Sequence, residues 1–261
     1  MTGRLPAGGR IDRGAPLRFT LDGVELTGYR GDTVASAMLA NEVVQVGPSI
    51  YRRRPRGVFT ADVTEPNALL QLDGRCSEPM LPATTTELFD GLAARTLSGV
   101  GRLDPTPDPA VYDKKYVHTD VLVVGAGSAG LASALAASAG GARVMLVDDQ
   151  PEPGGQLLSG ADRALLDWVA SARATLAGRP EVRVLARATA LRRDGTYLLV
   201  AERRTDHLGP AAPEHVSRQR LWHVRAGRLV LATGAHERPL VFADNDRPGI
   251  MLAGAVRTYL N

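Results

Sequence analysis

Three glycines are spaced so that a turn could hold a dinucleotide. Gly125, Gly127 and Gly130 follow an apolar run at residues 121–124 and precede small residues at 131–139. In a strand, turn and helix of this kind, the first glycine permits the tight turn. The second lets a pyrophosphate approach the backbone, and the third lets the helix pack on the strand. Because the start of the helix also favours phosphate, we predict a dinucleotide-binding turn here.

An acidic residue stands where such sites hold the ribose. Asp148 ends a second apolar run and lies about 20 residues beyond the glycines, where a carboxylate accepts ribose hydroxyls. Its charge favours a ribose without a 2′-phosphate. Further candidates for contact with the cofactor are Ala129, Asp149, Gln150, Gly155 and Gln156. For Asp149 and Gln150 the alternative is a solvated position. For Gly155 and Gln156 it is a turn that needs no ligand.

No set of residues points to acid–base, nucleophilic or metal-based catalysis. The five histidines are scattered without the spacing of metal ligands, and no Ser–His–Asp set is apparent. Cys76 is the single cysteine, so it cannot supply the four thiolates that iron–sulfur clusters usually need. It also has no partner cysteine for thiol redox chemistry. We therefore assign no catalytic residue and no metal site.

The composition indicates a chain with an ordinary core. With 261 residues it is long enough for two domains, and its net charge of +3 is small. No apolar stretch has the length of a membrane span, and residues 1–16 lack the apolar core of a signal peptide. Basic residues are not concentrated among aromatics as in nucleic-acid-binding proteins. We expect a cytoplasmic protein with neither a membrane nor a nucleic acid as partner.

A parallel sheet with helices must position the glycine motif. Residues 161–177 carry apolar side chains at helical spacing, and further apolar runs have the length of strands. These runs are residues 144–147, 182–185, 197–201, 221–224 and 229–232. The order of these elements predicts a Rossmann-like α/β domain over residues 118–261. Residues 249–260 begin a helix that nothing caps, so we expect the chain to be a fragment of a longer polypeptide.

A small α+β domain precedes this one. Two strand-like runs are joined by Asp22-Gly23, a strong hairpin signal, and Asp32 or Thr33 can cap the helix that follows. The runs are residues 18–21 and 24–29, and the helix ends near residue 40. With further short strands, these elements predict a small β-grasp-like α+β domain over residues 17–102.

Two further elements are expected inside this domain. An apolar run at residues 58–60 predicts a strand, and the capping-box pattern at 84–87 predicts a helix over residues 88–95. The arginine-rich loop at 51–57 is interpreted as a solvated loop, with a grip on phosphate or on an acidic partner surface as the alternative.

The domain limits follow from composition. Residues 103–109 contain three prolines at alternate positions and can only be extended, which places a linker at 103–117. Residues 1–16 are rich in Gly, Arg and Pro, and we predict a flexible leader there.

Several stretches together resemble the alpha subunit of heterotetrameric sarcosine oxidase. They are residues 112–120 leading into the glycine motif, 154–157, 232–239 and 247–254, with 54–57 and 84–88 in the first domain. The resemblance implies a ferredoxin-like module without an iron–sulfur cluster, followed by an NAD-binding domain. It also implies an enzyme that acts on the CH–NH group of sarcosine, demethylating it oxidatively to glycine with oxygen as the acceptor.

The resemblance further implies where cofactors and partners lie. The beta subunit carries the amine-oxidising FAD and binds the small amine, FMN lies between alpha and beta, and gamma and delta subunits complete the assembly. NAD is then the dinucleotide of this chain, Ala190 lies against its adenine, and Thr233 and Gly234 close near it. FAD is the alternative, because in relatives with two dinucleotide sites the first glycine motif usually holds FAD.

Two other functions are compatible with the residues. One is a self-contained FAD-dependent oxidoreductase that acts on NAD(P)H. The other is a non-catalytic assembly domain that uses its dinucleotide only for structure. The ligand released from the purified protein distinguishes some of these hypotheses. A flavin absorption band favours the self-contained enzyme. Colourless NAD favours either the sarcosine oxidase subunit or the assembly domain.

Overall fold

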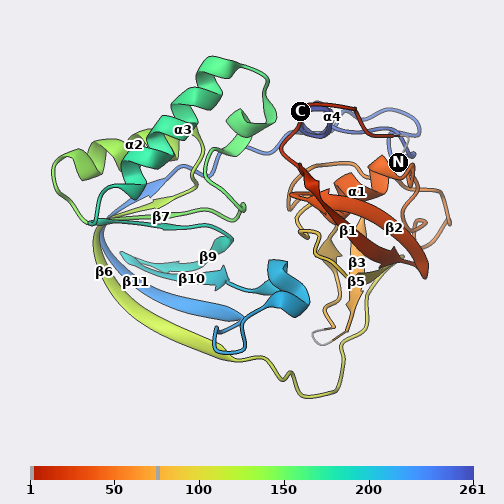
Figure 1. Ribbon diagram of the computed structural model, residues 1–261, viewed down its shortest axis with the longest axis horizontal. Helices are drawn as coiled ribbons and strands as arrows, with labels where there is room; N and C mark the ends of the chain where they lie inside the picture. Colours follow the sequence, from red (N-terminus) through yellow and green to blue (C-terminus); the bar gives the residue numbers. More distant parts are fainter. Residues whose placement is uncertain (1–2, 75–76) are drawn as a thin grey trace. The chain divides into compact units, whose positions relative to one another are not determined.

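The computed structural model describes residues 3–74 and 77–261, and Figure 1 draws them by element. They form two compact units. The first consists of Met1–Ala110, His207–Ala212 and His236–Asn261, and the second of Val111–Asp206 and Pro213–Ala235. The last 26 residues, His236–Asn261, were included in the predicted second domain, but they pack with the first unit. Cys76 lies outside the described residues, so its thiol chemistry stays a prediction.

The first unit is built on a five-stranded sheet with strand order β2-β1-β5-β3-β4. Its strands are β1 (Asp12–Leu21), β2 (Val24–Arg30), β3 (Leu69–Asp73), β4 (Leu81–Pro82) and β5 (Leu92–Thr96). Its α-helices are α1 (Val34–Ala40) and α4 (Ala253–Leu260). Asp22 and Gly23 have φ angles of 51° and 82°, as a two-residue hairpin turn requires. Phe19, Met38 and Leu70 are fully buried in the core between α1 and the sheet.

Residues 84–87 serve the start of α1 rather than a helix of their own. The carbonyl groups of Ala83 and Thr86 accept hydrogen bonds from the N–H groups of Ala35 and Val34, both at 2.9 Å. The predicted helix over residues 88–95 is therefore wrong, and this stretch leads into β5. Its physical reason is period-two burial: Leu92 and Ala94 are buried, whereas their neighbours are not.

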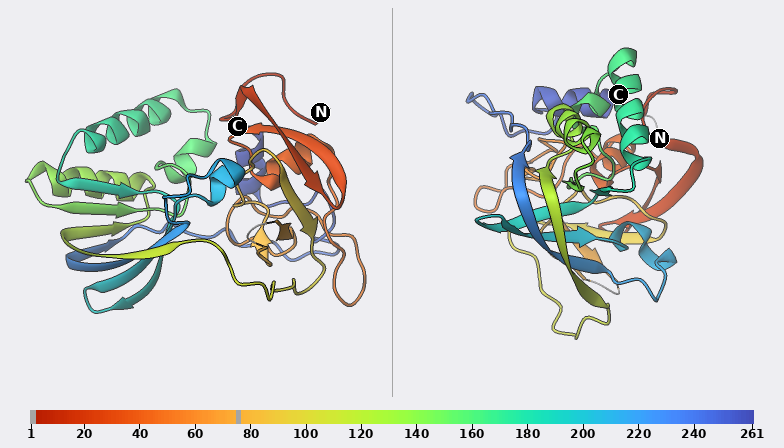
Figure 2. Two further views of the ribbon diagram at one scale, coloured as in Figure 1. Left: turned by 60° about the horizontal axis from the view of Figure 1, so that its bottom comes forward. Right: turned by 90° about the vertical axis from the view of Figure 1, so that its left-hand side faces the viewer.

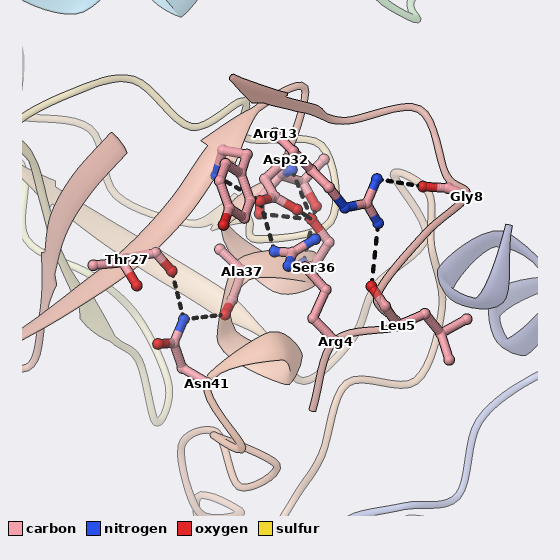
Figure 3. A network of polar contacts seen from close by, with 11 residues as sticks. Arg4, Leu5, Gly8, Arg13, Thr27, Asp32, Ser36, Ala37 and Asn41 are labelled. Carbon is pink, nitrogen blue, oxygen red and sulfur yellow. Dashed lines mark hydrogen bonds and ion pairs between the residues drawn. The ribbon is translucent and has the colours of Figure 1, made fainter. Parts of the chain in front are cut away.

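The N-terminal arm, predicted as a flexible leader, makes specific contacts within the first unit (Figure 3). Arg4 donates to the Asp32 carboxylate at 2.7 Å, and Asp32 also accepts from Tyr29 N–H at 2.8 Å and from the Ser36 hydroxyl at 2.6 Å. Arg13 donates to the backbone carbonyl groups of Leu5 and Gly8. In addition, β1 begins at Asp12, inside the predicted leader.

The arginine-rich loop pairs with acidic residues of its own chain. Arg54 contacts both Asp244 and Asp246, and Arg56 contacts Asp246 at 3.2 Å. The apolar run at residues 58–60 was predicted as a strand, but it forms none. The N–H groups of Phe59 and Thr60 donate to the Glu65 carboxylate instead of to a neighbouring strand. The sequence analysis gave an acidic partner surface as an alternative contact of this loop. The acidic residues that the loop contacts lie in the His236–Asn261 segment of the same chain.

The second unit is built on a six-stranded sheet with strand order β8-β7-β6-β11-β10-β9. Its strands are β6 (Tyr112–Val124), β7 (Val144–Val147), β8 (Val182–Leu185), β9 (Ala188–Asp194), β10 (Tyr197–Arg203) and β11 (Gln219–Leu231). Its helices are α2 (Ser128–Ala139) and α3 (Arg163–Ala177), with a short 3-10 helix at Gly155–Ser159. Another short 3-10 helix, at Asp206–Ala211, lies almost entirely in the first unit. β6, β7, β8 and β11 are parallel, and β9, β10 and β11 form an antiparallel meander.

Two apolar cores lie on the two faces of this sheet. One is formed by the strands and includes Trp222 and Val200, and the other lies under α2 and α3 and includes Leu131 and Leu176. Figure 2 shows α2 and α3 together on one side of the sheet. This arrangement of sheet and helices agrees with the α/β fold predicted for the second half of the chain.

Strand limits differ from the prediction where charged residues and glycine interrupt the apolar pattern. The runs at 221–224 and 229–232 belong to one long strand, β11, which pairs with β6 from Gln219 opposite Tyr112 to Leu231 opposite Val124. Backbone pairing with β6 carries β11 across Gly227. β6 itself begins inside the predicted linker, and β9 was not predicted as a strand. In the described part of the chain, none of the helices is sufficiently long and apolar to span a bilayer.

Candidate dinucleotide-binding site

Two of the three motif glycines are required by backbone packing. Gly125 leaves β6 with a φ angle of 97°, and a Cβ there would overlap the carbonyl group of Ala232. A Cβ on Gly130, in the first turn of α2, would overlap the carbonyl oxygen of Gly125. These two glycines therefore let the strand, the turn and the helix meet closely, whether or not a ligand binds.

Gly127 differs from its neighbours because nothing in the chain requires it to be glycine. Its φ angle is −70°, which any residue adopts, and a Cβ there would have no atom within 4 Å. As the N-cap of α2 it has no side chain, and no side-chain cap forms at this helix. The start of a 12-residue helix thus faces open space at Gly127. This is the geometry that a pyrophosphate group needs.

A second glycine turn lies directly against the first. Gly154 N–H donates to the carbonyl group of Ala126 at 2.8 Å, and a Cβ on Gly155 would lie 2.8 Å from the Gly127 Cα. The structure therefore brings the predicted candidate Gly155 to the glycine motif, with Gln156 exposed beside it. Gly154 was missed as a site residue. Its signal was the glycine pair itself, since φ angles of 144° and 55° suit only glycine well.

Asp148 is held by the glycine turn. Its carboxylate accepts from the Ala126 N–H group and, at 2.9 Å, from the Gln150 N–H group. The residue is buried, and burial raises the pKa of this carboxyl above its ordinary value, although the two N–H groups partly offset the effect. Asp148 therefore links the end of β7 to the glycine turn.

Asp149 and Gln150 are less buried than Asp148. The Gln150 side-chain amide donates to the Asp149 carboxylate at 3.0 Å, and both residues are half-buried. Asp149 thus offers carboxylate oxygens that are not taken by the turn. Of the two adjacent acids, the geometry favours Asp149 as the group that could reach a ribose.

The remaining candidates surround the same turn to different degrees. Thr233 and Gly234 follow β11, and Thr233 Cα would lie 3.1 Å from a Cβ on Gly125. Ala190 lies on β9 opposite Val200, and this strand starts beside Asp148, whose carbonyl group accepts from Ala188 N–H at 2.8 Å. Ala129 is exposed in the first turn of α2. The role of each of these residues toward a cofactor stays a prediction.

Within residues 3–74 and 77–261, no group of three or more His, Cys, Asp and Glu side chains is placed to hold a metal ion. The groups gathered at the glycine turn are backbone N–H groups at the start of α2 and the carboxylates of Asp148 and Asp149.

Two family models match the chain, one in each half. Residues 14–99 match a 2Fe-2S iron-sulfur cluster binding domain, and residues 120–221 match an FAD dependent oxidoreductase. These matches cover the ferredoxin-like module and the domain that carries the glycine motif. They support a flavoprotein-type oxidoreductase fold.

Curated relatives match nearly the whole chain. It is 54% identical to sarcosine oxidase subunit alpha of Corynebacterium sp. (strain U-96), with 98% of this chain and 28% of the relative covered. It is 41% identical to sarcosine oxidase subunit alpha of Rhizobium meliloti (strain 1021), with 99% and 32% covered. The predicted resemblance is confirmed, and the chain spans about three-tenths of the length of these relatives.

A solved structure has the same arrangement of elements. L-proline dehydrogenase from P. horikoshii aligns with a TM-score of 0.66 at 25% identity, and the alignment covers 91% of this chain and 44% of that one. The described fold is thus shared with that dehydrogenase.

Proposed function

We propose that this chain is the dinucleotide-binding part of an oxidoreductase subunit of the sarcosine oxidase type, and that NAD lies on its glycine turn. One observation carries the proposal. The start of α2 faces open space at Gly127, in a chain that is 41–54% identical to alpha subunits of sarcosine oxidase. Because a side chain would fit there, glycine is best explained by a ligand that approaches the backbone.

The proposed roles follow the geometry of the turn. The pyrophosphate lies over Gly127 and the first N–H groups of α2, with Ala129 alongside and the Gly155–Gln156 turn closing the other side. Asp149, with Gln150, accepts the ribose hydroxyls, while Asp148 holds the turn in shape. Ala190 borders the adenine, and Thr233 with Gly234 borders the rest of the cofactor.

We assign the oxidation of the amine to partner subunits. In the proposed reaction the N-methyl C–H and N–H of sarcosine together lose two electrons and two protons, which gives an imine. Water hydrolyses this imine to glycine and formaldehyde, and oxygen finally accepts the two electrons and two protons to become hydrogen peroxide. A flavin supplies that redox chemistry when it is bound against the substrate. Described residues of this chain contribute no convincing acid–base pair, so its own part is to bind and orient a dinucleotide and to join the assembly.

The partners in this proposal are the beta, gamma and delta types of sarcosine oxidase subunit. FMN lies at the interface with the beta type, and the small amine binds in that partner. A cytoplasmic location of the assembly is part of this proposal.

FAD in place of NAD is a second candidate with an observation of its own. Residues 120–221, which include the whole glycine motif, match the FAD dependent oxidoreductase family model. In this case the chain would belong to a self-contained flavoenzyme acting on NAD(P)H.

The test is the ligand itself. The purified chain is denatured, and the released small molecules are examined by absorption and mass spectrometry. NAD without a flavin band supports the proposal, FAD in stoichiometric amount transfers the site to the second candidate, and no dinucleotide at all after incubation with NAD or FAD overturns both.

A second measurement addresses activity. Oxygen consumption with sarcosine and added flavins is measured for the chain alone and again after partner subunits are supplied. We expect turnover only in the second case. Sustained turnover by the chain alone would contradict the division of labour and favour the self-contained flavoenzyme. An assembly without turnover, despite bound NAD, would favour a purely structural dinucleotide.

A further inference from the structure

The ferredoxin-like module contains a loop with the spacing of cluster ligands but without cysteines. Plant-type [2Fe–2S] proteins use Cys at the spacing C-x4-C-x2-C, followed by a fourth Cys further along the chain. In the loop between α1 and β3, Thr60, Glu65 and Ala68 have this spacing, and each is buried. Thr84, also buried, follows them and donates from its hydroxyl to the carbonyl group of Asp62 at 2.6 Å.

These side chains do not fit a cluster. A hydroxyl, a carboxylate, a methyl group and a second hydroxyl replace the four soft thiolates that iron–sulfur clusters prefer. Cys76, the single cysteine, is at none of these positions. Residues 14–99 match the family model for a 2Fe-2S cluster binding domain, but these four positions within that range carry no cysteine.

The Glu65 carboxylate collects the N–H groups of the loop. One oxygen accepts from Phe59 N–H at 2.9 Å, from Thr60 N–H at 2.7 Å and from the Thr60 hydroxyl at 3.2 Å. The other oxygen accepts from Asn67 N–H at 2.9 Å and from Ala68 N–H at 3.0 Å. Only 4% of the residue is exposed. Converging backbone N–H groups are what an iron–sulfur site offers to its anionic cluster, and here they surround a side-chain anion.

The His236–Asn261 segment rests on the same loop. Leu252 N–H donates to the carbonyl group of Phe59 at 3.0 Å, and the Tyr259 hydroxyl of α4 donates to that of Thr60 at 2.9 Å. Tyr259 is half-buried, and burial of its phenol, followed by the charges of Glu65 and Asp62, raises the pKa of that phenol well above the usual range. The loop is thus covered by protein on the side that α4 contacts.

We propose that the Glu65 carboxylate takes the place of the cluster as the anion of this loop. With the carboxylate in place of a cluster, the module has no redox group in this loop. The loop instead provides a structural contact surface for the segment that ends in α4. This inference concerns the first unit and does not depend on which dinucleotide binds to the second.

The first test is iron loading of the unaltered chain. The protein is incubated anaerobically with ferrous iron and sulfide, desalted, and assayed for iron, acid-labile sulfide and visible absorption. We expect none of the three above the level of a blank. Two iron atoms per chain with matching sulfide would overturn the proposal, whatever the behaviour of any variant.

The second test replaces the anion with its neutral counterpart. In Glu65→Gln, an amide NH₂ faces N–H groups that previously had an acceptor. Because the amide keeps one acceptor oxygen, we expect the amide protons of one pair, Phe59 with Thr60 or Asn67 with Ala68, to exchange with solvent at least about tenfold faster. The exposed carboxylate of Glu25, on β2 of the same unit, is the matched control.

Exchange at these amides should be unchanged in Glu25→Gln. Equal rates in Glu65→Gln and the unaltered chain would mean that the carboxylate does not hold the loop, and the proposal would fail. If Glu65→Gln does not fold while Glu25→Gln does, the loss of the fold itself shows that the anion is required, and iron loading of the unaltered chain still decides whether it replaces a cluster.

Discussion

Two loops of this molecule gather backbone N–H groups, and they use them differently. In the first unit the Glu65 carboxylate accepts four N–H groups and fills the loop from within. In the second unit the turn at Gly127 has no side chain, and a Cβ there would meet nothing within 4 Å. A loop that supplies its own anion is complete as it folds, whereas a loop that leaves the space open is prepared for an anion from outside.

The open turn is not open throughout. Gly125 and Gly130 are in contact with backbone atoms that a Cβ would overlap, and Asp148 already accepts the Ala126 N–H group. Of the three motif glycines, Gly127 alone combines ordinary backbone angles with free space. The comparison therefore rests on single positions, and substitutions at those positions test it.

The largest effect is expected from Gly130→Ala. The added Cβ would overlap the carbonyl oxygen of Gly125, and a backbone atom cannot move aside as a flexible side chain can. We expect the free energy of unfolding to fall by about 3 kcal/mol or more, as overpacking at a rigid contact does. Urea denaturation measures it, and Gly127→Ala is the matched control, with a change within about 1 kcal/mol. Equal stabilities of these two variants would remove the distinction between a packing glycine and an open one.

Gly127→Val fills the open turn with the chain's own atoms, as Glu65 fills the first loop. We expect the dinucleotide to bind at least about 100-fold more weakly, a loss of about 2.7 kcal/mol, because the side chain would occupy the place of the pyrophosphate. The fold should be retained, since no chain atom lies within 4 Å of the new Cβ. Isothermal titration with NAD or FAD measures the affinity.

The control for this prediction lies at the other end of the same helix. Gly140 is the C-cap of α2 and has a φ angle of −90°, and a Cβ there would likewise meet no atom within 4 Å. Gly140→Val should therefore bind the dinucleotide as the unaltered chain does. An unchanged affinity in a folded Gly127→Val protein would show that the open space is not a ligand site.

The sequence predicted the open turn better than the filled loop. Gly-x-Gly-x-x-Gly between a strand and a helix has few structural alternatives, because each glycine meets a separate steric demand. The Asp22-Gly23 hairpin was predictable for the same reason, since positive φ angles at both residues favour these types. Local backbone demands are therefore visible in residue types.

The filled loop was not predictable because its contacts depend on the path of the chain. Nothing in the sequence shows that the Glu65 carboxylate turns inward to the N–H groups of Phe59 and Ala68. The helix predicted from the capping-box pattern at 84–87 is wrong for a similar reason. The carbonyl groups of Ala83 and Thr86 accept hydrogen bonds from the first residues of α1, which are distant in the sequence. Burial also separates Asp148, to which the sequence analysis assigned the ribose, from the less buried Asp149.

Asp149→Ala tests that ranking with a smaller effect. Its carboxylate is not held by the turn, so we expect loss of the ribose contact to weaken dinucleotide binding about tenfold, or about 1.4 kcal/mol, with little change in stability. Asp194→Ala, which removes an exposed carboxylate at the end of β9, is the matched control for charge. Equal affinities of the two variants would mean that Asp148 or Gln150, and not Asp149, contacts the ribose.

The smallest effect is expected in the pH dependence of stability at Asp148. Burial raises the pKa of this carboxyl, so the folded protein binds its proton more tightly than the unfolded chain does. The stability that this group contributes is therefore fully present below the ordinary pKa of 3.8 and is lost as pH rises through the raised value. Asp148→Asn cannot titrate, so the unaltered chain should lose stability relative to this variant over that range. Urea denaturation between about pH 3 and pH 7 measures the difference.

Asp120 provides a control of opposite sign in the same unit. Hydrogen bonds from the Arg143 side chain and backbone lower the pKa of Asp120 to about 2. The stability that this carboxylate contributes is therefore fully present above pH 3.8 and is lost as pH falls from 3.8 through about 2. The unaltered chain should therefore gain stability relative to Asp120→Asn as pH rises. If Asp148→Asn behaved in the same way, the turn's N–H groups would be stabilising the anion of Asp148, just as the first loop holds Glu65. The second loop would then be partly filled by its own anion, and the contrast between the two loops would be reduced to Gly127 alone.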